Sequence, residues 1–313
     1  YQFSVDNFNS MTSVLRGIGE LGDKSIVTVS SGKQDTDIFG NPVENTGDYA
    51  GAVIAESDGE FLIFTYADAV RAADSINVRF SDGTKIAGTV RQIDEVLGMA
   101  VVAVPSGNLP EEERKKVQVL SLANSYTVKA GDVLVGIGGP SGQVHSLSFG
   151  TVSYVARNVQ ITDGLTRILY ADISSNSQTG TFLINTAGEM VGWTSESCRT
   201  ISSYKPILER LTNGASAAYL GILGQDVSRA MQGSGIPAGV YVTEAVSGSP
   251  AYDAGIQPGD IIVKFGTKEI GSFKDLQAQI ENSASGVSVS VNVMRKGRDG
   301  YTEIPFLVSL RAR

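Results

Sequence analysis

Side chains suited to acid–base or metal chemistry are scarce in this chain of 313 residues, which contains one histidine, His145, and one cysteine, Cys198. A single imidazole excludes zinc sites built on two histidines. A single thiol excludes an internal disulfide and a zinc site built on several cysteines. The acidic residues do not follow the spacing of a calcium-binding loop. We therefore expect no metal and no cofactor, and a hydroxyl nucleophile would have at most one imidazole as its base.

The elements that must position such side chains are mainly β-strands. Between Ser25 and Trp193, short apolar runs alternate with turn residues, and Asp-Gly between apolar runs is typical of a β-hairpin. Such pairs occur at Asp58-Gly59, Asp82-Gly83 and Asp163-Gly164. Many short strands with these turns predict antiparallel barrels or sandwiches. The segment from Asp35 to Asp48 is polar and is predicted to be a loose loop.

The C-terminal third has a different pattern. Tyr204 to Leu211 predicts a helix that Ser203 can cap, and the small polar residues from Asn213 to Ala218 predict a linker. A second helix is predicted from Phe273 to Asn282, because Ser272 and Asp275 form a capping-box pattern. The alternating valines after this helix predict a strand, and Asp-Gly at residues 299–300 predicts a hairpin.

Composition restricts the class of partner. The 25 Lys and Arg residues against 33 Asp and Glu residues give a net charge of −8, and an acidic chain without a basic cluster argues against nucleic acid. No apolar run reaches the roughly 18 residues of a membrane span. Residues 1–20 form a weakly amphipathic segment. The first residues, Tyr-Gln-Phe-Ser, lack an initiator Met and indicate a trimmed or a processed chain.

Several segments carry a resemblance to a known family. They include Tyr49–Thr65, Phe182–Gly192, Tyr219–Ile222 and Ser249-Pro-Ala-Tyr-Asp-Ala-Gly-Ile-Gln-Pro-Gly-Asp-Ile-Ile262. In order and spacing, the chain resembles the HtrA/DegP-like trypsin-type serine proteases with a C-terminal PDZ domain. The resemblance implies a mainly β fold: a trypsin-like double antiparallel β-barrel of six strands each, followed by a PDZ domain. The expected parts are an N-terminal segment (1–20), a protease domain (21–213) and a PDZ domain (217–313).

The resemblance also places the catalytic positions, and all three are altered. The family's catalytic histidine aligns with Asp68, its catalytic aspartate with Gly98, and its nucleophilic serine with Thr179. His145 does not align with the position of the base, and we expect it to be a surface or edge histidine. A carboxylate at residue 68 is a weak base with a reference pKa of about 3.9, and it would place negative charge beside a developing oxyanion.

The oxyanion hole is altered as well. In the family it uses backbone N–H groups of the nucleophile and of a glycine two residues earlier, and these positions correspond to Thr179 and Ser177. We therefore expect a degenerate pseudoprotease with no intact catalytic triad. The alternative is an atypical endopeptidase in which Thr179 attacks with help from Asp68 or a bound water. Ser177 is the other candidate hydroxyl, because the preceding loop is one residue shorter than in the family.

The PDZ unit departs less from its family. A PDZ domain binds a peptide by strand addition, and a turn of backbone N–H groups takes the C-terminal carboxylate. Tyr219, Leu220, Gly221 and Ile222 resemble that loop. Leu276 and Ile280 on the predicted helix are equally suited to the side-chain pocket or to the core.

We therefore expect binding of unfolded or C-terminal peptide segments, in a scaffold, chaperone-like or regulatory role. A second reading treats the barrels as structure and the PDZ unit as the working part. The resemblance implies a bacterial, extracytoplasmic protein of the cell envelope, a homo-trimer, and a membrane association only through an N-terminal anchor that is absent from this chain. The acidic composition adds the expectation of no nucleic-acid partner.

Overall fold

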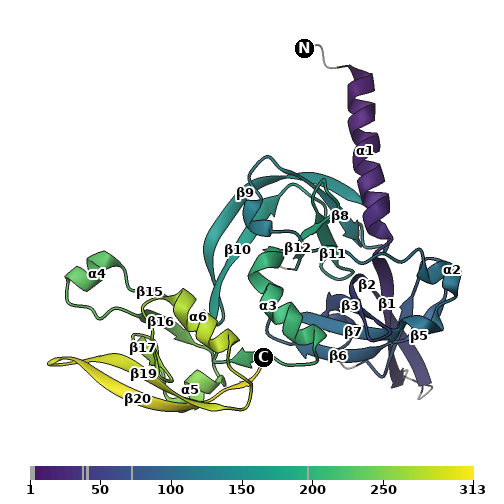
Figure 1. Ribbon diagram of the computed structural model, residues 1–313. Coiled ribbons are helices and arrows are strands. Elements are labelled where there is room, and N and C mark those ends of the chain that lie inside the picture. The colour runs from purple at the N-terminus through teal and green to yellow at the C-terminus, as the bar shows by residue number, and fades with distance from the viewer. Residues whose placement is uncertain (1–3, 37–38, 40–41, 72, 196) are drawn as a thin grey trace. The chain divides into compact units, whose positions relative to one another are not determined.

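The computed structural model describes residues 4–313, apart from residues 37–38, 40–41, 72 and 196. The chain divides into two compact units. Unit 1 contains Tyr1–Ala156 and Arg167–Gly214, and unit 2 contains Arg157–Thr166 and Ala215–Arg313. No helix among the described residues combines the length and the apolar character that a membrane crossing requires. Each unit is built mainly from antiparallel strands (Figure 1).

The first sheet of unit 1 has seven strands in the order β5-β4-β1-β2-β3-β7-β6. Its strands are β1 (Ile26–Thr36), β2 (Pro42–Ser57), β3 (Glu60–Tyr66), β4 (Ser75–Arg79), β5 (Lys85–Ala87), β6 (Thr89–Asp94) and β7 (Met99–Pro105). The expected number was six. Gly88 separates β5 from β6, and a Cβ there would lie 2.7 Å from a methyl group of Val102. The core inside this sheet contains buried valines together with Ile63, Phe61 and Phe80.

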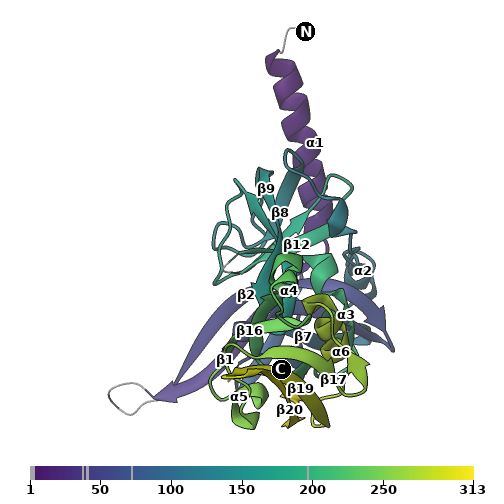
Figure 2. The ribbon, with the colours of Figure 1, turned by 90° about the vertical axis from the view of Figure 1, so that its left-hand side faces the viewer.

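The prediction of a loose loop from Asp35 to Asp48 is wrong for its described part. Strands β1 and β2 pair antiparallel from Ile26↔Ala52 out to Thr36↔Pro42, and they form a long arm (Figure 2). The loop was predicted because the sequence of this segment does not alternate between apolar and polar residues. Its backbone hydrogen bonds are nevertheless satisfied by the opposite strand, which is sufficient for an exposed two-stranded arm continuing from a buried sheet.

The second sheet of unit 1 is a closed barrel in the order β10-β13-β12-β11-β8-β9. Its six strands are β8 (Val133–Gly138), β9 (Ser148–Ile161), β10 (Gly164–Ala171), β11 (Thr181–Ile184), β12 (Met190–Thr194) and β13 (Cys198–Thr200). The predicted Asp-Gly turn connects β9 to β10. Phe64 of the first sheet packs edge-on against Trp193 of the barrel, with ring centroids 5.2 Å apart. The two sheets of unit 1 therefore share a buried aromatic contact.

Unit 1 also contains helices. Helix α1 (Val5–Asp23) is capped by Ser4, and α2 (Glu111–Arg114) is a single turn. Helix α3 (Ile201–Thr212) begins three residues before the predicted helix, so its N-cap is Thr200 and the predicted cap at Ser203 is wrong. Short 3₁₀ turns are η1 (Ala67–Ala69), η2 (Ser106–Asn108) and η3 (Ser125–Thr127).

Unit 2 folds around Phe273, whose side chain is fully buried. Its main sheet runs β15-β16-β17-β19-β20, with β18 paired to β17, and a small sheet pairs β14 with β21. Helix α6 (Phe273–Glu281) begins where the capping box predicts, because Ser272 accepts a hydrogen bond from the Asp275 amide. The remaining elements are β14 (Ala218–Tyr219), β15 (Ile222–Asp226), α4 (Arg229–Gly233), β16 (Val240–Ala245), α5 (Pro250–Ala254), β17 (Ile261–Phe265), β18 (Lys268–Glu269), β19 (Ser288–Gly297), β20 (Gly300–Ser309) and β21 (Arg311–Ala312).

Candidate functional site

Thr179 lies just before β11, and its contacts are those of a structural side chain. It is 7% exposed, and its hydroxyl donates to the carbonyl of Gly142 at 3.1 Å. Its own N–H donates to Oδ1 of Asn176 at 2.9 Å. The N–H group that an oxyanion hole would use is thus held by a side chain. Ser177, the other candidate hydroxyl and oxyanion position, is exposed to solvent.

Asp68 lies in η1, immediately after β3, and its carboxylate faces solvent. The side chain is 70% exposed and forms an ion pair of 2.7 Å with Arg71, which also binds Glu95 at 2.6 Å. Gly98, at the expected position of the catalytic aspartate, has a φ of 66° and open space where a side chain would begin. The partner of Asp68 is therefore Arg71, and the hydroxyl of Thr179 is bound to a carbonyl.

His145 is exposed, as predicted for a surface histidine. Its Nδ1 lies 3.0 Å from a carboxylate oxygen of Asp23, the last residue of α1. The imidazole thus takes part in a surface contact between the end of a helix and the loop after β8. Among the described residues, no group of three or more His, Cys, Asp or Glu side chains could hold a metal ion.

Tyr66 is a residue that sequence reasoning did not single out. Its hydroxyl donates to the carbonyl of Thr194 at 2.7 Å and accepts from the amide of Thr181 at 2.9 Å. Burial raises the pKa of this phenol well above its ordinary value. A Cβ on Gly180 would lie 2.2 Å from the Tyr66 ring, so the ring fills the space beside that glycine. Tyr66 therefore joins β3 to the barrel strands β11 and β12.

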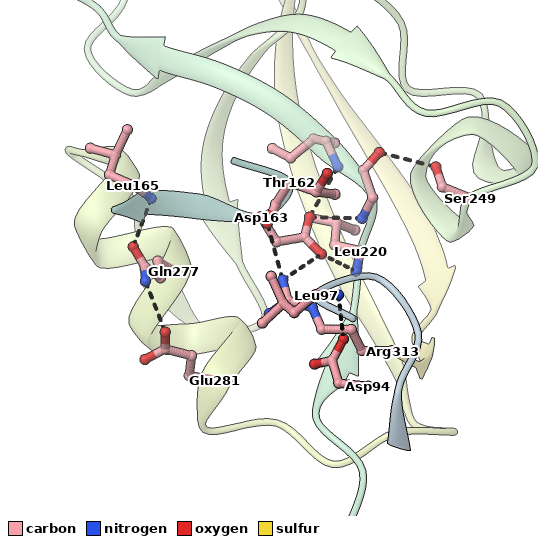
Figure 3. A network of polar contacts seen from close by, with 12 residues as sticks. Asp94, Leu97, Thr162, Asp163, Leu165, Leu220, Ser249, Gln277, Glu281 and Arg313 are labelled. Atoms are coloured by element: carbon pink, nitrogen blue, oxygen red, sulfur yellow. Dashed lines mark hydrogen bonds and ion pairs between the residues drawn. The ribbon is translucent and has the colours of Figure 1, made fainter. Parts of the chain in front are cut away.

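The second candidate site is the loop between β14 and β15 in unit 2. The backbone N–H groups of Leu220, Gly221 and Ile222 all donate to the carboxylate of Asp163, at 2.9, 2.7 and 3.0 Å (Figure 3). Gly221 has a φ of 87°, and a Cβ at this position would lie 2.1 Å from the Cβ of Ser249. This loop needs glycine both for its conformation and for its close packing. It forms a binding site for one carboxylate.

The walls of this site are β15 and α6. Strand β15 is the edge strand of the main sheet of unit 2 and pairs with β16. Leu276 and Ile280, which the sequence left open between pocket and core, are 0% and 2% exposed and belong to the hydrophobic core of this unit. Tyr219 at the start of the loop is half-buried, and burial raises the pKa of its phenol, with a further contribution from the negative charge of Asp163. The loop that binds the carboxylate therefore packs against the hydrophobic core of unit 2, to which Leu220 and Ile222 also belong.

Comparisons with known proteins agree with this arrangement. Residues 50–192 match a family model described as "Trypsin-like peptidase domain", and residues 218–305 match one described as "PDZ domain". The "Probable periplasmic serine endoprotease DegP-like" of Hahella chejuensis is 28% identical over 282 residues, which cover 83% of this chain and 58% of that protein. The "Serine protease Do-like HtrA" of Bacillus subtilis is 24% identical over 310 residues, 87% of this chain and 68% of that protein.

A solved structure titled "HtrA-type protease AlgW with decapeptide" has a TM-score of 0.65 with 17% identity, and the match covers 96% of this chain and 98% of that one. It shows the same fold. In sequence and in fold, the chain is similar to HtrA/DegP-like proteases. It combines a trypsin-like domain with a PDZ domain, and it spans less than two thirds of the length of the DegP-like relative from Hahella chejuensis.

The HtrA-like chain holds one feature that its sequence pattern did not predict. The Asp163-Gly164 pair was interpreted only as a turn, and it does connect β9 to β10. In the structure, residues 157–166 belong to unit 2, with the PDZ loop, although β9 and β10 are strands of the second barrel of unit 1. A signal was present in the turn itself, since the same Asp-Gly pair that makes the turn also places a carboxylate at its tip.

Proposed function

We propose that this HtrA-like chain binds the C-terminal ends of peptides or unfolded proteins through its PDZ loop. The observation that carries this proposal is the convergence of three backbone N–H groups, from Leu220, Gly221 and Ile222, on a single carboxylate. A peptide ending in a free carboxylate presents the same group, and a charge-assisted hydrogen bond is stronger than a neutral one. The free edge of β15 provides the backbone partners for strand addition.

The trypsin-like domain serves in this proposal as a pseudoprotease, a folded support without peptide hydrolysis. Three contacts favour this role: the Thr179 hydroxyl donates to Gly142, its N–H donates to Asn176, and Asp68 binds Arg71. An acylation site needs a hydroxyl bonded to a base, and free N–H donors where the oxyanion develops. In a serine protease of a different fold that uses the same triad, loss of the nucleophile or the base alone costs about 10⁶-fold in kcat.

The setting that fits this function is the bacterial cell envelope. Relatives named as periplasmic endoproteases, including the "Periplasmic pH-dependent serine endoprotease DegQ" of Escherichia coli, support an extracytoplasmic place. We propose a scaffold, chaperone-like or regulatory role there, with assembly as a homo-trimer and an N-terminal membrane anchor in the full-length protein. Analytical ultracentrifugation tests the trimer directly, because a monomer of 32.9 kDa and its trimer sediment at clearly different rates.

A cleavage assay separates the pseudoprotease from an atypical endopeptidase that uses Thr179. The native chain, Thr179→Ala and Ser177→Ala are incubated with casein at high concentration, and the products are followed by mass spectrometry. We expect no cleavage by any of the three. Cleavage by the native chain that is lost only in Thr179→Ala would establish a threonine nucleophile. Cleavage by the native chain that is lost only in Ser177→Ala would identify Ser177 as the nucleophile.

A binding assay tests peptide capture itself. Fluorescent decapeptide pools with Val, Leu or Phe at the last position are prepared as free acids and as C-terminal amides, and anisotropy is measured with the native chain and with Gly221→Val. We expect the free acids to bind and the amides not to bind, because the amide removes the charge that the loop accepts. Gly221→Val should abolish binding, since any side chain there meets Ser249. Equal binding of acids and amides would contradict capture by the loop.

A further inference from the structure

The tip of the β9–β10 hairpin, residues 162–165, occupies the carboxylate site of the PDZ loop, which lies between β14 and β15. Asp163 is fully buried, and both of its carboxylate oxygens accept backbone hydrogen bonds: Oδ2 from Leu220, and Oδ1 from Gly221 and Ile222. Figure 3 shows this side chain pointing into the loop. Every donor that a peptide C-terminus would use in the loop is therefore already bonded to a carboxylate of the same chain.

The backbone of the tip also forms a hydrogen bond of the kind that an added peptide strand would form with β15. The Asp163 N–H donates to the carbonyl of Ile222 at 2.8 Å, in the direction opposite to the bond from the Ile222 N–H to Asp163 Oδ1. This exchange lies on the edge of β15 at which a peptide strand would begin. The tip thus takes both the anion site and the first backbone position of the edge.

The other wall of the groove holds the tip as well. On α6, Oε1 of Gln277 accepts from the Leu165 N–H at 3.0 Å, and the Gln277 amide nitrogen donates to Glu281 at 2.9 Å. A Cβ on Gly164 would lie 2.7 Å from the end of the Gln277 side chain, so a larger residue at this point of the turn would require Gln277 to shift. Leu165 packs against the hydrophobic core of unit 2. The tip therefore lies between β15 and α6, with one apolar side chain directed to the core.

From these contacts we propose that Asp163 is an internal ligand of the PDZ loop, and that the hairpin tip must leave the groove before a peptide C-terminus can bind. This inference rests on the proposed function, because it describes the regulation of the same site. The structure is then the closed state, and peptide capture is a competition between two carboxylates. The apparent Kd of a peptide then equals its intrinsic Kd divided by the fraction of molecules whose groove is open.

The charges around the tip make this competition reversible. Burial raises the pKa of Asp163, while Arg313, 3.7 Å away, and the three N–H groups of the loop act in the opposite direction. Arg313 also donates to the carbonyl of Thr162 at 3.0 Å, and Tyr219 is the titratable side chain next to the loop. A buried carboxylate loses its hydration, and this loss offsets part of its hydrogen bonding. Release of Asp163 to water recovers that hydration, so an incoming carboxylate can replace it.

Peptide binding to tip variants tests the inference. The free-acid and amide decapeptide pools are titrated into the native chain, Asp163→Ala and the matched control Gln160→Ala, which changes an exposed residue on β9 of the same hairpin. We expect Asp163→Ala to bind the free acids at least about tenfold more tightly than the native chain, which corresponds to a groove that is open in at most about one native molecule in ten. Gln160→Ala should match the native chain.

Hydrogen exchange on the native chain gives a second readout that does not depend on a variant. Addition of the free-acid pool should speed exchange of the amides at residues 163 and 165, which lose their partners Ile222 and Gln277 when the tip leaves. Equal affinity of the native chain and Asp163→Ala, or binding that leaves this exchange unchanged, would overturn the internal ligand while peptide capture stands. Absence of binding by every variant, Asp163→Ala included, would overturn peptide capture itself.

Discussion

Substitution of Gly221 by alanine should destabilise unit 2 by an amount that the loop geometry sets. A φ of 87° is the left-handed region, where a side chain costs about 1–2 kcal/mol. The new Cβ would also lie 2.1 Å from the Cβ of Ser249, a buried residue. Relieving such an overlap in a packed region costs about 1–3 kcal/mol. We therefore expect Gly221→Ala to lower the free energy of unfolding of unit 2 by roughly 2–5 kcal/mol.

Gly286→Ala is the matched control for this prediction. Gly286 lies in the same unit with a φ of 83°, and nothing lies within 4 Å of the position of its Cβ. This variant should lose only the conformational part, about 1–2 kcal/mol. The contact with Ser249 can be isolated further by combining Gly221→Ala with Ser249→Gly, which removes the overlapping atom and keeps a residue that is accepted at an N-cap. We expect a coupling of about 1–3 kcal/mol in this double-mutant cycle.

Each unit can be followed by its own probe in the same sample. Hydrogen exchange of amides in β16 and β19 reports the opening of unit 2. Fluorescence of Trp193, the single tryptophan, reports the unfolding of unit 1 in urea, and it should not change in these variants. If Gly221→Ala and Gly286→Ala differ by less than about 0.5 kcal/mol, or if Ser249→Gly fails to reduce the cost, the close contact is not what requires glycine in the loop.

Two further perturbations test buried polar groups. Tyr66→Phe leaves the Thr194 carbonyl and Thr181 amide without their hydroxyl partner, so urea unfolding followed by Trp193 fluorescence should show a loss of about 1–3 kcal/mol, and exposed Tyr154→Phe should show none. The raised pKa of Asp163 means that the folded state holds its proton more tightly than the unfolded chain, so this group adds stability as the pH falls through the raised pKa toward 3.8. The free energy of unfolding of unit 2 in the native chain, minus that in Asp163→Asn, should therefore increase as the pH is lowered. A decrease of this difference would show that the pKa of Asp163 is not raised in the folded state.

The sequence alone determined those features that depend on local chemistry. One histidine and one cysteine restricted the possible sites before any fold was known. Asp-Gly pairs located hairpins, since this dipeptide favours the backbone angles of a tight turn, and Ser272 located the start of α6 by capping it. The order of these elements was sufficient to indicate a trypsin-like domain followed by a PDZ domain.

Other features depend on partners distant in the sequence, and only the tertiary structure decided them. Strands β1 and β2 extend through a polar segment because each satisfies the backbone of the other. Leu276 and Ile280 lie in a core whose other members come from six strands, two helices and further loops, so their helical spacing could not separate core from pocket. Asp163 is more than fifty residues from the amides that bind it. A turn signal describes four residues, whereas the role of the carboxylate at its tip depends on a loop that folds beside it.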